Sequence, residues 1–184
     1  LPSGCAEVAK YGLIDDPGFF AWCETNAGQV LSGSPIARRT AIEHCVAAKA
    51  RFVMADPDDT AGTRALLNFG HTFGHAIEGL GGNRIFHGEA IALGATLAFR
   101  FSVSEGLCPP EDADRVGAHV QAVGLPTAIG DVGLHGQSVF AAMQSDKKAT
   151  ASGLTLILTR GIGRAFVARD VDGPRLADFL AQQA

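Results

Sequence analysis

Apolar residues recur at helical spacing along most of the chain, and short turn signals separate the helical stretches. Asp16 stands directly before Pro17, and Ser34 stands directly before Pro35. A side-chain oxygen followed by proline is typical of a helix start, because the oxygen accepts from a free backbone N–H and proline fits the first helical position. We therefore predict a helix from each proline, the second running up to the break at "DPDDTAG" (56–62).

The middle of the chain continues the helical pattern. The stretch 64–80 fits one helix that ends at Gly81 and Gly82. The stretch "GEAIALGATLAFRFSVSE" is nearly all apolar, which predicts a central buried helix closed by Gly106. Proline and acids in the first turn and a final glycine predict a helix at residues 109–124, and final cations mark a short helix at 137–148.

The segment "LTLILTRGIGRAFVARDV" breaks the helical pattern, because it alternates and is rich in β-branched residues. With Gly161 and Gly163 at its middle it predicts a β-hairpin, followed by a terminal helix. "GIGRAF" matches the dinucleotide fingerprint only in part, since Phe166 takes the third glycine position and no helix follows. The expected fold is mainly α, a single domain over residues 1–184 with one small antiparallel β-hairpin.

Composition narrows the class of protein. The net charge of −4 argues against nucleic acid and against an anionic membrane surface as partners. No apolar run reaches the ~18 residues of a membrane span. The four cysteines show no CxxC spacing, so we expect reduced thiols in a cytoplasmic protein. The first residue is not Met, and we expect the chain to be part of a longer protein.

The stretch "LNFGHTFGHAIE" carries the clearest candidate chemistry. His71 and His75 are four residues apart, so they lie on one face of a helix. Gly70 and Gly74 each cost about 1 kcal/mol in a helix interior relative to Ala. We expect this cost to be offset by the close approach of another backbone or of a ligand.

A third histidine, His87, follows a loop long enough to return the chain toward His71. Two or three imidazoles and one carboxylate make a catalytic metal site with an open position. Spacing leaves three carboxylates open as the further ligand: Glu7, Glu78 and Glu89. The donor set suits zinc, with iron(II) and manganese as alternatives. The other histidines are expected to be structural or solvated: His44, His119 and His135.

Cations and an amide accompany the histidines in the sequence. Arg64, Asn68, His71 and His75 are spaced by four, three and four residues, which predicts one continuous helical stripe suited to an anion and a metal. Further cations that could serve the same anion are Lys10, Lys49, Lys147 and Lys148.

Four motifs together resemble the C-terminal domain of the 3-dehydroquinate synthase family: "AEVAKYGLI", "LLNFGHTFGHAIE", "FHGEAIALG" and "SDKK". The family's enzyme converts a seven-carbon keto sugar-acid phosphate (DAHP) into 3-dehydroquinate and phosphate in the shikimate pathway. It uses zinc and an NAD that is reduced and re-oxidised in one turnover. The resemblance implies a homodimer, an NAD bound mainly by an N-terminal domain absent from this chain, and no turnover by the chain alone.

The resemblance also implies a role for each motif residue. Glu7, His71 and His87 would bind the metal, and His75 would be an acid–base group beside the substrate. The groups expected to contact the substrate's carboxylate, phosphate and hydroxyls are Lys10, Lys49, Arg64, Asn68 and one of Lys147 and Lys148. One departure is "DPDDTAGTR", which is one residue longer than the family pattern between Lys49 and Arg64.

Three alternatives remain beside this interpretation. One is a related sugar-phosphate cyclase that makes deoxy-scyllo-inosose or valiolone. Another is an iron-dependent polyol dehydrogenase of related architecture. The third is a helical metal-binding or interaction module without catalysis, for which the Arg, Asn and His residues have no evident use.

Overall fold

The computed structural model describes residues 2–58, 60, 62–147 and 154–183, with only the backbone described at 146 and 147. Within these ranges it contains eight α-helices, three short 3₁₀ turns and one two-stranded sheet. In chain order they are α1 (Pro2–Asp15), α2 (Pro17–Ser32), α3 (Pro35–Ala55), η1 (Arg64–Asn68), α4 (His71–Gly81), η2 (Gly82–Arg84), α5 (His87–Ser104), α6 (Pro110–Ala122), η3 (Ile129–Val132), α7 (Gly136–Lys147), β1 (Leu154–Thr159), β2 (Ala165–Val171) and α8 (Gly173–Ala181).

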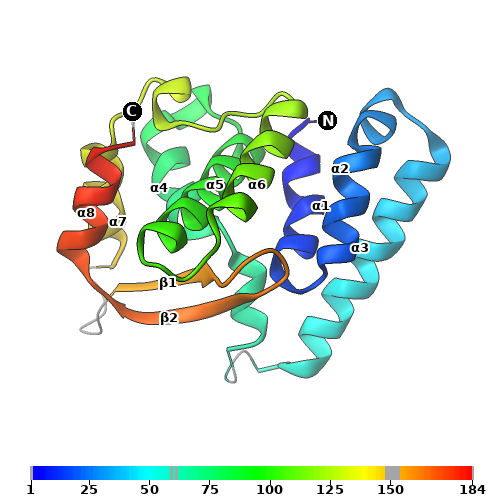
Figure 1. The fold of residues 1–184 in the computed structure, drawn as a ribbon, viewed down its shortest axis with the longest axis horizontal. Coiled ribbons are helices and arrows are strands. Elements are labelled where there is room, and N and C mark those ends of the chain that lie inside the picture. Colours follow the sequence, from blue (N-terminus) through cyan, green and yellow to red (C-terminus); the bar gives the residue numbers. More distant parts are fainter. Residues whose placement is uncertain (1, 59, 61, 148–153, 184) are drawn as a thin grey trace.

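Helix α5 is the centre of the fold (Figure 1). It packs against α1, α4, α6, α8 and β1, while α2 and α3 lie beyond α1. Its side chains Leu93, Leu97 and Phe99 are fully buried. The prediction of a central buried helix is confirmed, and every element around it buries an apolar face there.

Helices α4 and α5 approach one another through glycines. A Cβ atom at Gly70 would lie 2.8 Å from the backbone N of Ala95, and one at Gly94 would collide with the carbonyl oxygen of Gly70. A Cβ at Gly74 would lie 2.6 Å from the Ile91 side chain. The approach of α5 therefore compensates for Gly74 inside α4, one of the explanations that the sequence leaves open, and it also leaves no room for a side chain at Gly70, which precedes the helix.

The predicted continuous helix over 64–80 is wrong. Residues Arg64–Asn68 form a 3₁₀ turn, Phe69 leaves the helical region with ψ 128°, and Gly70 takes φ 80°. The ring of Phe69 is fully buried, so the chain turns inward there before α4 starts at His71. Arg64, Asn68 and the histidines therefore do not form a single helical stripe.

The remaining predicted elements are confirmed. Asp16 accepts from the backbone N of Phe19 at 2.9 Å, and Ser34 accepts from that of Ala37 at 3.4 Å. Strands β1 and β2 pair antiparallel, from Leu154 opposite Val171 through an irregularity to Thr159 opposite Ala165. The fold is mainly α with one small hairpin, as expected.

The scattered histidines have structural or solvated surroundings. His44 stacks on Phe19 with ring centroids 3.5 Å apart, and buried His119 meets Phe20 edge-on at 5.3 Å. His135 is exposed. These positions agree with the roles that the sequence predicts for them.

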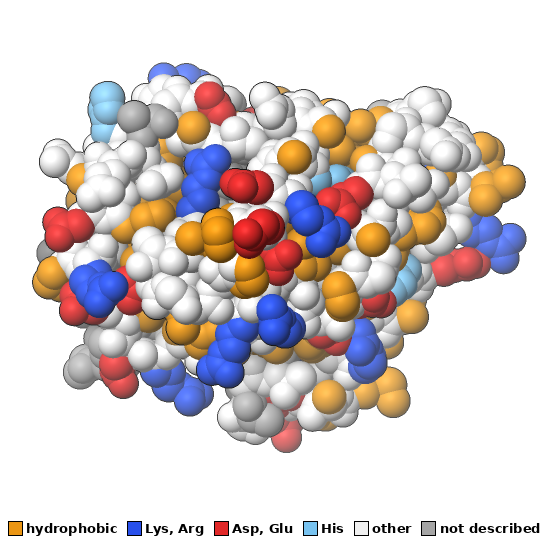
Figure 2. Space-filling view, viewed as in Figure 1, with side chains coloured by type: hydrophobic (Ala, Val, Ile, Leu, Met, Phe, Trp, Pro, Cys, Tyr) orange, Lys and Arg blue, Asp and Glu red, His pale blue; other side chains and the backbone are white. Residues whose placement is uncertain are grey.

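The surface mixes charges of both signs. Acidic and basic side chains are interspersed with apolar ones on the face shown in Figure 2. Among the described residues, no helix is both long enough and apolar enough to span a bilayer.

Candidate metal centre and active site

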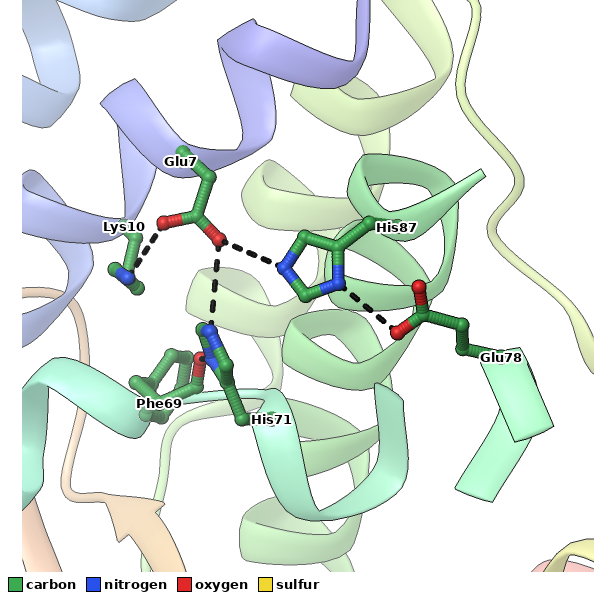
Figure 3. A network of polar contacts seen from close by, with 6 residues as sticks. All are labelled: Glu7, Lys10, Phe69, His71, Glu78 and His87. Carbon is green, nitrogen blue, oxygen red and sulfur yellow. Dashed lines mark hydrogen bonds and ion pairs between the residues drawn. The ribbon is translucent and has the colours of Figure 1, made fainter. Parts of the chain in front are cut away.

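Glu7, His71 and His87 converge from three helices (Figure 3). His71 and His87 are the first residues of α4 and α5, and Glu7 comes from the middle of α1. One donor atom from each lies within 4.8 Å of the others. Glu7 Oε1 is 3.7 Å from His71 Nε2 and 3.9 Å from His87 Nε2.

The three donors fit a bound divalent metal. Glu7 Oε1 is buried and has no hydrogen-bond partner among the residues that the structure describes, and such an atom is costly unless something else satisfies it. Zinc–nitrogen and zinc–oxygen bonds of about 2.0–2.1 Å at tetrahedral angles separate two ligand atoms by about 3.4 Å. The two separations from Glu7 Oε1 to the histidine nitrogens exceed this by a few tenths of an ångström, and all three donor atoms lie within 4.8 Å of one another. Bringing the donors onto one ion therefore needs movement of their side chains.

His71 is arranged as a neutral ligand. Its Nδ1 lies 3.1 Å from the carbonyl oxygen of Phe69, which can only accept, so Nδ1 carries the proton and Nε2 presents its lone pair to the site. Burial lowers the pKa of His71, with the positive charge of Lys10 adding to the effect and the Phe69 hydrogen bond opposing it. The imidazole is therefore neutral near pH 7, as metal binding requires.

The geometry distinguishes the three carboxylates that spacing left open. Glu7 alone faces both histidines. Glu78 lies behind His87 and contacts its Nδ1 at 3.0 Å. Glu89 accepts from the backbone N of Phe86 at 2.8 Å and so caps α5. Of the three, Glu7 is the one whose carboxylate could share a metal ion with His71 and His87.

Lys10 is part of the same cluster. Its side chain is buried, and Nζ lies 2.6 Å from Glu7 Oε2, the oxygen that does not face the histidines. Buried lysines need such a partner, because an isolated ammonium is expensive to desolvate. The pair fixes the Glu7 carboxylate so that Oε1 points to His71 and His87 (Figure 3).

A pocket of about 330 Å³ opens beside the donors. It gathers three cations, an amide and a phenol around the metal-site residues; its lining is Glu7, Lys10, Tyr11, Lys49, Arg64, Leu67, Asn68 and His71. The structure thus brings together four of the predicted substrate-contact residues, although they do not share one helix. Tyr11 was not predicted, and its place next to Lys10 in "AEVAKYG" was the available signal.

The loop after α3 positions Arg64. Buried Asp56 accepts from the backbone N of Thr60 at 2.9 Å and from that of Arg64 at 3.2 Å. The Arg64 guanidinium donates to the carbonyl oxygen of Pro57 at 3.0 Å. The extra residue in this loop therefore does not remove Arg64 from the pocket.

His75 lies next to the donor cluster and outside it. Its ring centroid is 5.3 Å from that of His71 and 6.2 Å from that of His87. It is exposed and lines a second pocket of about 460 Å³ between α4 and α7, which also includes Met143 and Ser145. The predicted contacts of Lys147 and Lys148 lie outside the described side chains.

The cysteines take no part in this centre. All four are free thiols. Burial raises the pKa of Cys23 to about 12 and those of Cys45 and Cys108 to about 11. Such thiols are protonated at neutral pH and are poor metal ligands and nucleophiles.

The fold is that of the sugar-phosphate cyclases. A 2-epi-5-epi-valiolone synthase from Streptomyces hygroscopicus subsp. jinggangensis, with NAD+ and Zn2+ bound, superposes with a TM-score of 0.84 at 24% identity, over 97% of this chain and 49% of that one. A 2-deoxy-scyllo-inosose synthase complexed with carbaglucose-6-phosphate, NAD+ and Co2+ gives a TM-score of 0.75 at 23% identity, over 100% of this chain and 51% of that one.

Sequence comparison is more specific than the fold. The family described as 3-dehydroquinate synthase C-terminal matches residues 4–149, and the chain belongs to this family. The 3-dehydroquinate synthase of Zymomonas mobilis is 45% identical over 184 residues, covering 98% of this chain and 48% of that protein. That of Brucella anthropi is 49% identical over 187 residues, covering 98% and 49%. The chain thus spans about half the length of these relatives.

Proposed function

We propose that this chain is the metal- and substrate-binding part of a 3-dehydroquinate synthase, which converts DAHP into 3-dehydroquinate and phosphate in the shikimate pathway. The observation that carries the proposal is the Glu7–His71–His87 donor group at the edge of a pocket with Lys10, Lys49 and Arg64. The relatives of the same name, 45% and 49% identical, support it.

The metal would be zinc or another divalent ion, held by Glu7, His71 and His87. A carboxylate and two imidazoles are typical zinc ligands and leave a position for substrate. Bound there, the metal would lower the pKa of substrate hydroxyl groups and orient them. The zinc and the cobalt in the two structural relatives support a divalent ion.

The cations of the pocket would bind the acidic ends of the substrate. Arg64 presents a planar guanidinium that suits a carboxylate or phosphate bidentately, and Lys49 adds a second positive charge. Asn68 is exposed at the pocket edge and would hydrogen-bond a hydroxyl or phosphate oxygen. Lys10 is buried beneath the pocket and would contribute from its floor.

His75 would carry the proton. The His75 ring lies close to the donor group but is not one of the three metal donors. Its ring nitrogens would therefore be available to a substrate hydroxyl. One of Lys147 and Lys148, in the "SDKK" motif, would add a further substrate contact.

Part of the active site would come from outside this chain. We propose that NAD, which would accept a hydride and return it, is bound mainly by the other half of the protein, because the chain covers about half of its relatives. We further propose a cytoplasmic homodimer, as the family resemblance implies. Residues 1–184 alone would then bind metal and fail to turn over.

Phosphate release from DAHP tests this function. The protein would be a chimera in which residues 1–184 replace the matching half of the Zymomonas mobilis relative, assayed with NAD and zinc. We expect turnover by the chimera, loss of turnover in its His75→Ala variant, and none with residues 1–184 alone. A folded, zinc-loaded chimera that releases no phosphate would contradict the proposal.

A related cyclase reaction is the second candidate, because the structural relatives make valiolone and deoxy-scyllo-inosose products. Those relatives are 24% and 23% identical, whereas the synthases named for dehydroquinate reach 45–49%. The same chimera assayed with the substrates of those two synthases in competition with DAHP would decide between them.

A further inference from the structure

Each of the three proposed metal donors contacts one protein group through the atom that does not face the metal position. The three contacting groups differ in charge. His71 donates to the neutral carbonyl of Phe69. Glu7 is paired with the ammonium of Lys10 at 2.6 Å. His87 contacts a carboxylate, Glu78, at 3.0 Å through Nδ1. Figure 3 shows Glu78 reaching His87 on the side away from Glu7.

His87 is also the most exposed donor. Its side chain is 48% exposed, against 15% for His71 and 35% for Glu7. Packing holds His71 in place, but packing alone does not fix the ring of His87. A hydrogen bond from Nδ1 to a carboxylate fixes both the tautomer and the ring orientation, so that Nε2 faces Glu7.

Charge gives Glu78 a second effect. The carboxylate of Glu7 is offset by Lys10, which leaves the donor group close to neutral. Lys49 and Arg64 line the adjoining pocket and add positive charge. A divalent cation is bound more tightly where the surrounding charge is negative. Among the described residues, Glu78 supplies a negative charge that no ion pair with Lys or Arg offsets.

A purely structural role does not account for Glu78. It lies in the last turns of α4, which ends at Gly81. A negative charge near a helix C-terminus is disfavoured by the helix dipole. Its side-chain partner is His87 of the next helix, so the contact serves the site and not the helix.

We propose that Glu78 is a positioning residue of the metal centre: it orients His87 and supplies the net negative charge that holds a divalent cation beside Lys10. The inference rests on the proposed metal site and concerns this chain's own affinity for metal. It makes Glu78 necessary for tight binding even though it is not a ligand.

The test is metal affinity in the Glu78→Gln and Glu78→Ala variants. Zn2+ affinity would be measured by competition with a chromophoric chelator, and geometry by the visible absorption of the Co2+-loaded protein. Glu78→Gln keeps a hydrogen-bond acceptor and removes the charge, whereas Glu78→Ala removes both. The matched control is Glu89→Gln, which removes a carboxylate two residues from His87 that does not touch a donor.

We expect Zn2+ binding to weaken about 10- to 100-fold in Glu78→Gln. In Glu78→Ala we expect at least as large a loss and an altered Co2+ spectrum, while Glu89→Gln keeps the original affinity. Far-UV circular dichroism checks the fold, which Ala in a helix should preserve. Unchanged Zn2+ affinity in Glu78→Gln, or an equal loss in Glu89→Gln, would overturn the inference alone. An unsubstituted protein that binds no metal would overturn both the inference and the proposed metal site.

Discussion

At the scale of single residues, neighbouring groups orient the side chains of the candidate centre. His71 is kept neutral by burial, and its proton is fixed on Nδ1 by the Phe69 carbonyl. Glu7 is kept in place by Lys10. A metal ion at the proposed site would therefore meet donors that neighbouring groups already orient.

Buried His119 makes the stability of the protein depend on pH. Burial lowers its pKa below the ordinary 6.5, with Glu24 partly opposing the effect. The unfolded imidazole therefore takes up a proton first as pH falls, so its contribution to stability is complete above about pH 6.5 and is lost below it. We expect His119→Gln to lose less stability between pH 7.5 and 5.5 than the unsubstituted protein, measured by urea unfolding.

His71 titrates in the same direction, so the slope of stability against pH should shrink in His119→Gln without vanishing. Identical slopes for the two proteins would show that His119 does not titrate on unfolding.

Residue types in the site could be predicted from sequence, but their partners could not. The motif resemblance proposed Glu7, His71 and His87, and the structure brings their donor atoms together. Spacing alone left Glu78 and Glu89 as equal candidates, because contacts between α1, α4 and α5 are not encoded in local periodicity. Tyr11 was missed for a similar reason. Its position next to Lys10 in the sequence does not by itself show that its side chain lines the pocket.

At the scale of elements, the contact between α4 and α5 places the two histidines. Both helices begin with a donor, and Gly70 and Gly94 let their backbones approach. We predict that Gly94→Ala destabilises the protein by about 1–3 kcal/mol, since the new methyl group meets the carbonyl oxygen of Gly70. Urea unfolding would measure the stability, and Zn2+ competition should show weaker binding.

Gly117→Ala is the control for this prediction. Gly117 lies inside α6 with open space around its Cβ position. There alanine should stabilise the helix by up to about 1 kcal/mol. Equal effects of the two substitutions would contradict the close-approach explanation.

The loop before η1 gives a second prediction at this scale. Asp56 accepts from two backbone N–H groups, including that of Arg64. Asp56→Ala should cost about 1–3 kcal/mol by leaving those donors unsatisfied, and should weaken inorganic phosphate binding by releasing Arg64. Exposed Asp58 provides the matched control, and Asp58→Ala should change neither property. Normal stability and phosphate binding in Asp56→Ala would refute the positioning of Arg64 by this residue.

Helix starts were predictable because their chemistry is local. Asp16 and Ser34 cap α2 and α3 as their sequence positions predict. The break at Phe69 and Gly70 was not predictable from spacing, because residues 64–80 fit a continuous helix equally well. It is the burial of the Phe69 ring and the contact of Gly70 with α5 that turn the chain there.

At the scale of the whole molecule, the centre lies where α4 and α5 begin and α1 crosses them (Figure 3). The buried α5 helix anchors this arrangement, and the pocket of Lys49 and Arg64 opens beside it. The core that supports the site therefore comes from this chain.

The central claim is the division of roles between the histidines, with His71 and His87 as ligands and His75 as the proton carrier. The most direct measurement is zinc content after loading and desalting, for Glu7→Ala, His71→Ala, His87→Ala and His75→Ala beside the unsubstituted protein. The account predicts retention of zinc in the unsubstituted protein and in His75→Ala, and its loss in the other three. Loss of zinc from His75→Ala as complete as from His71→Ala would contradict it.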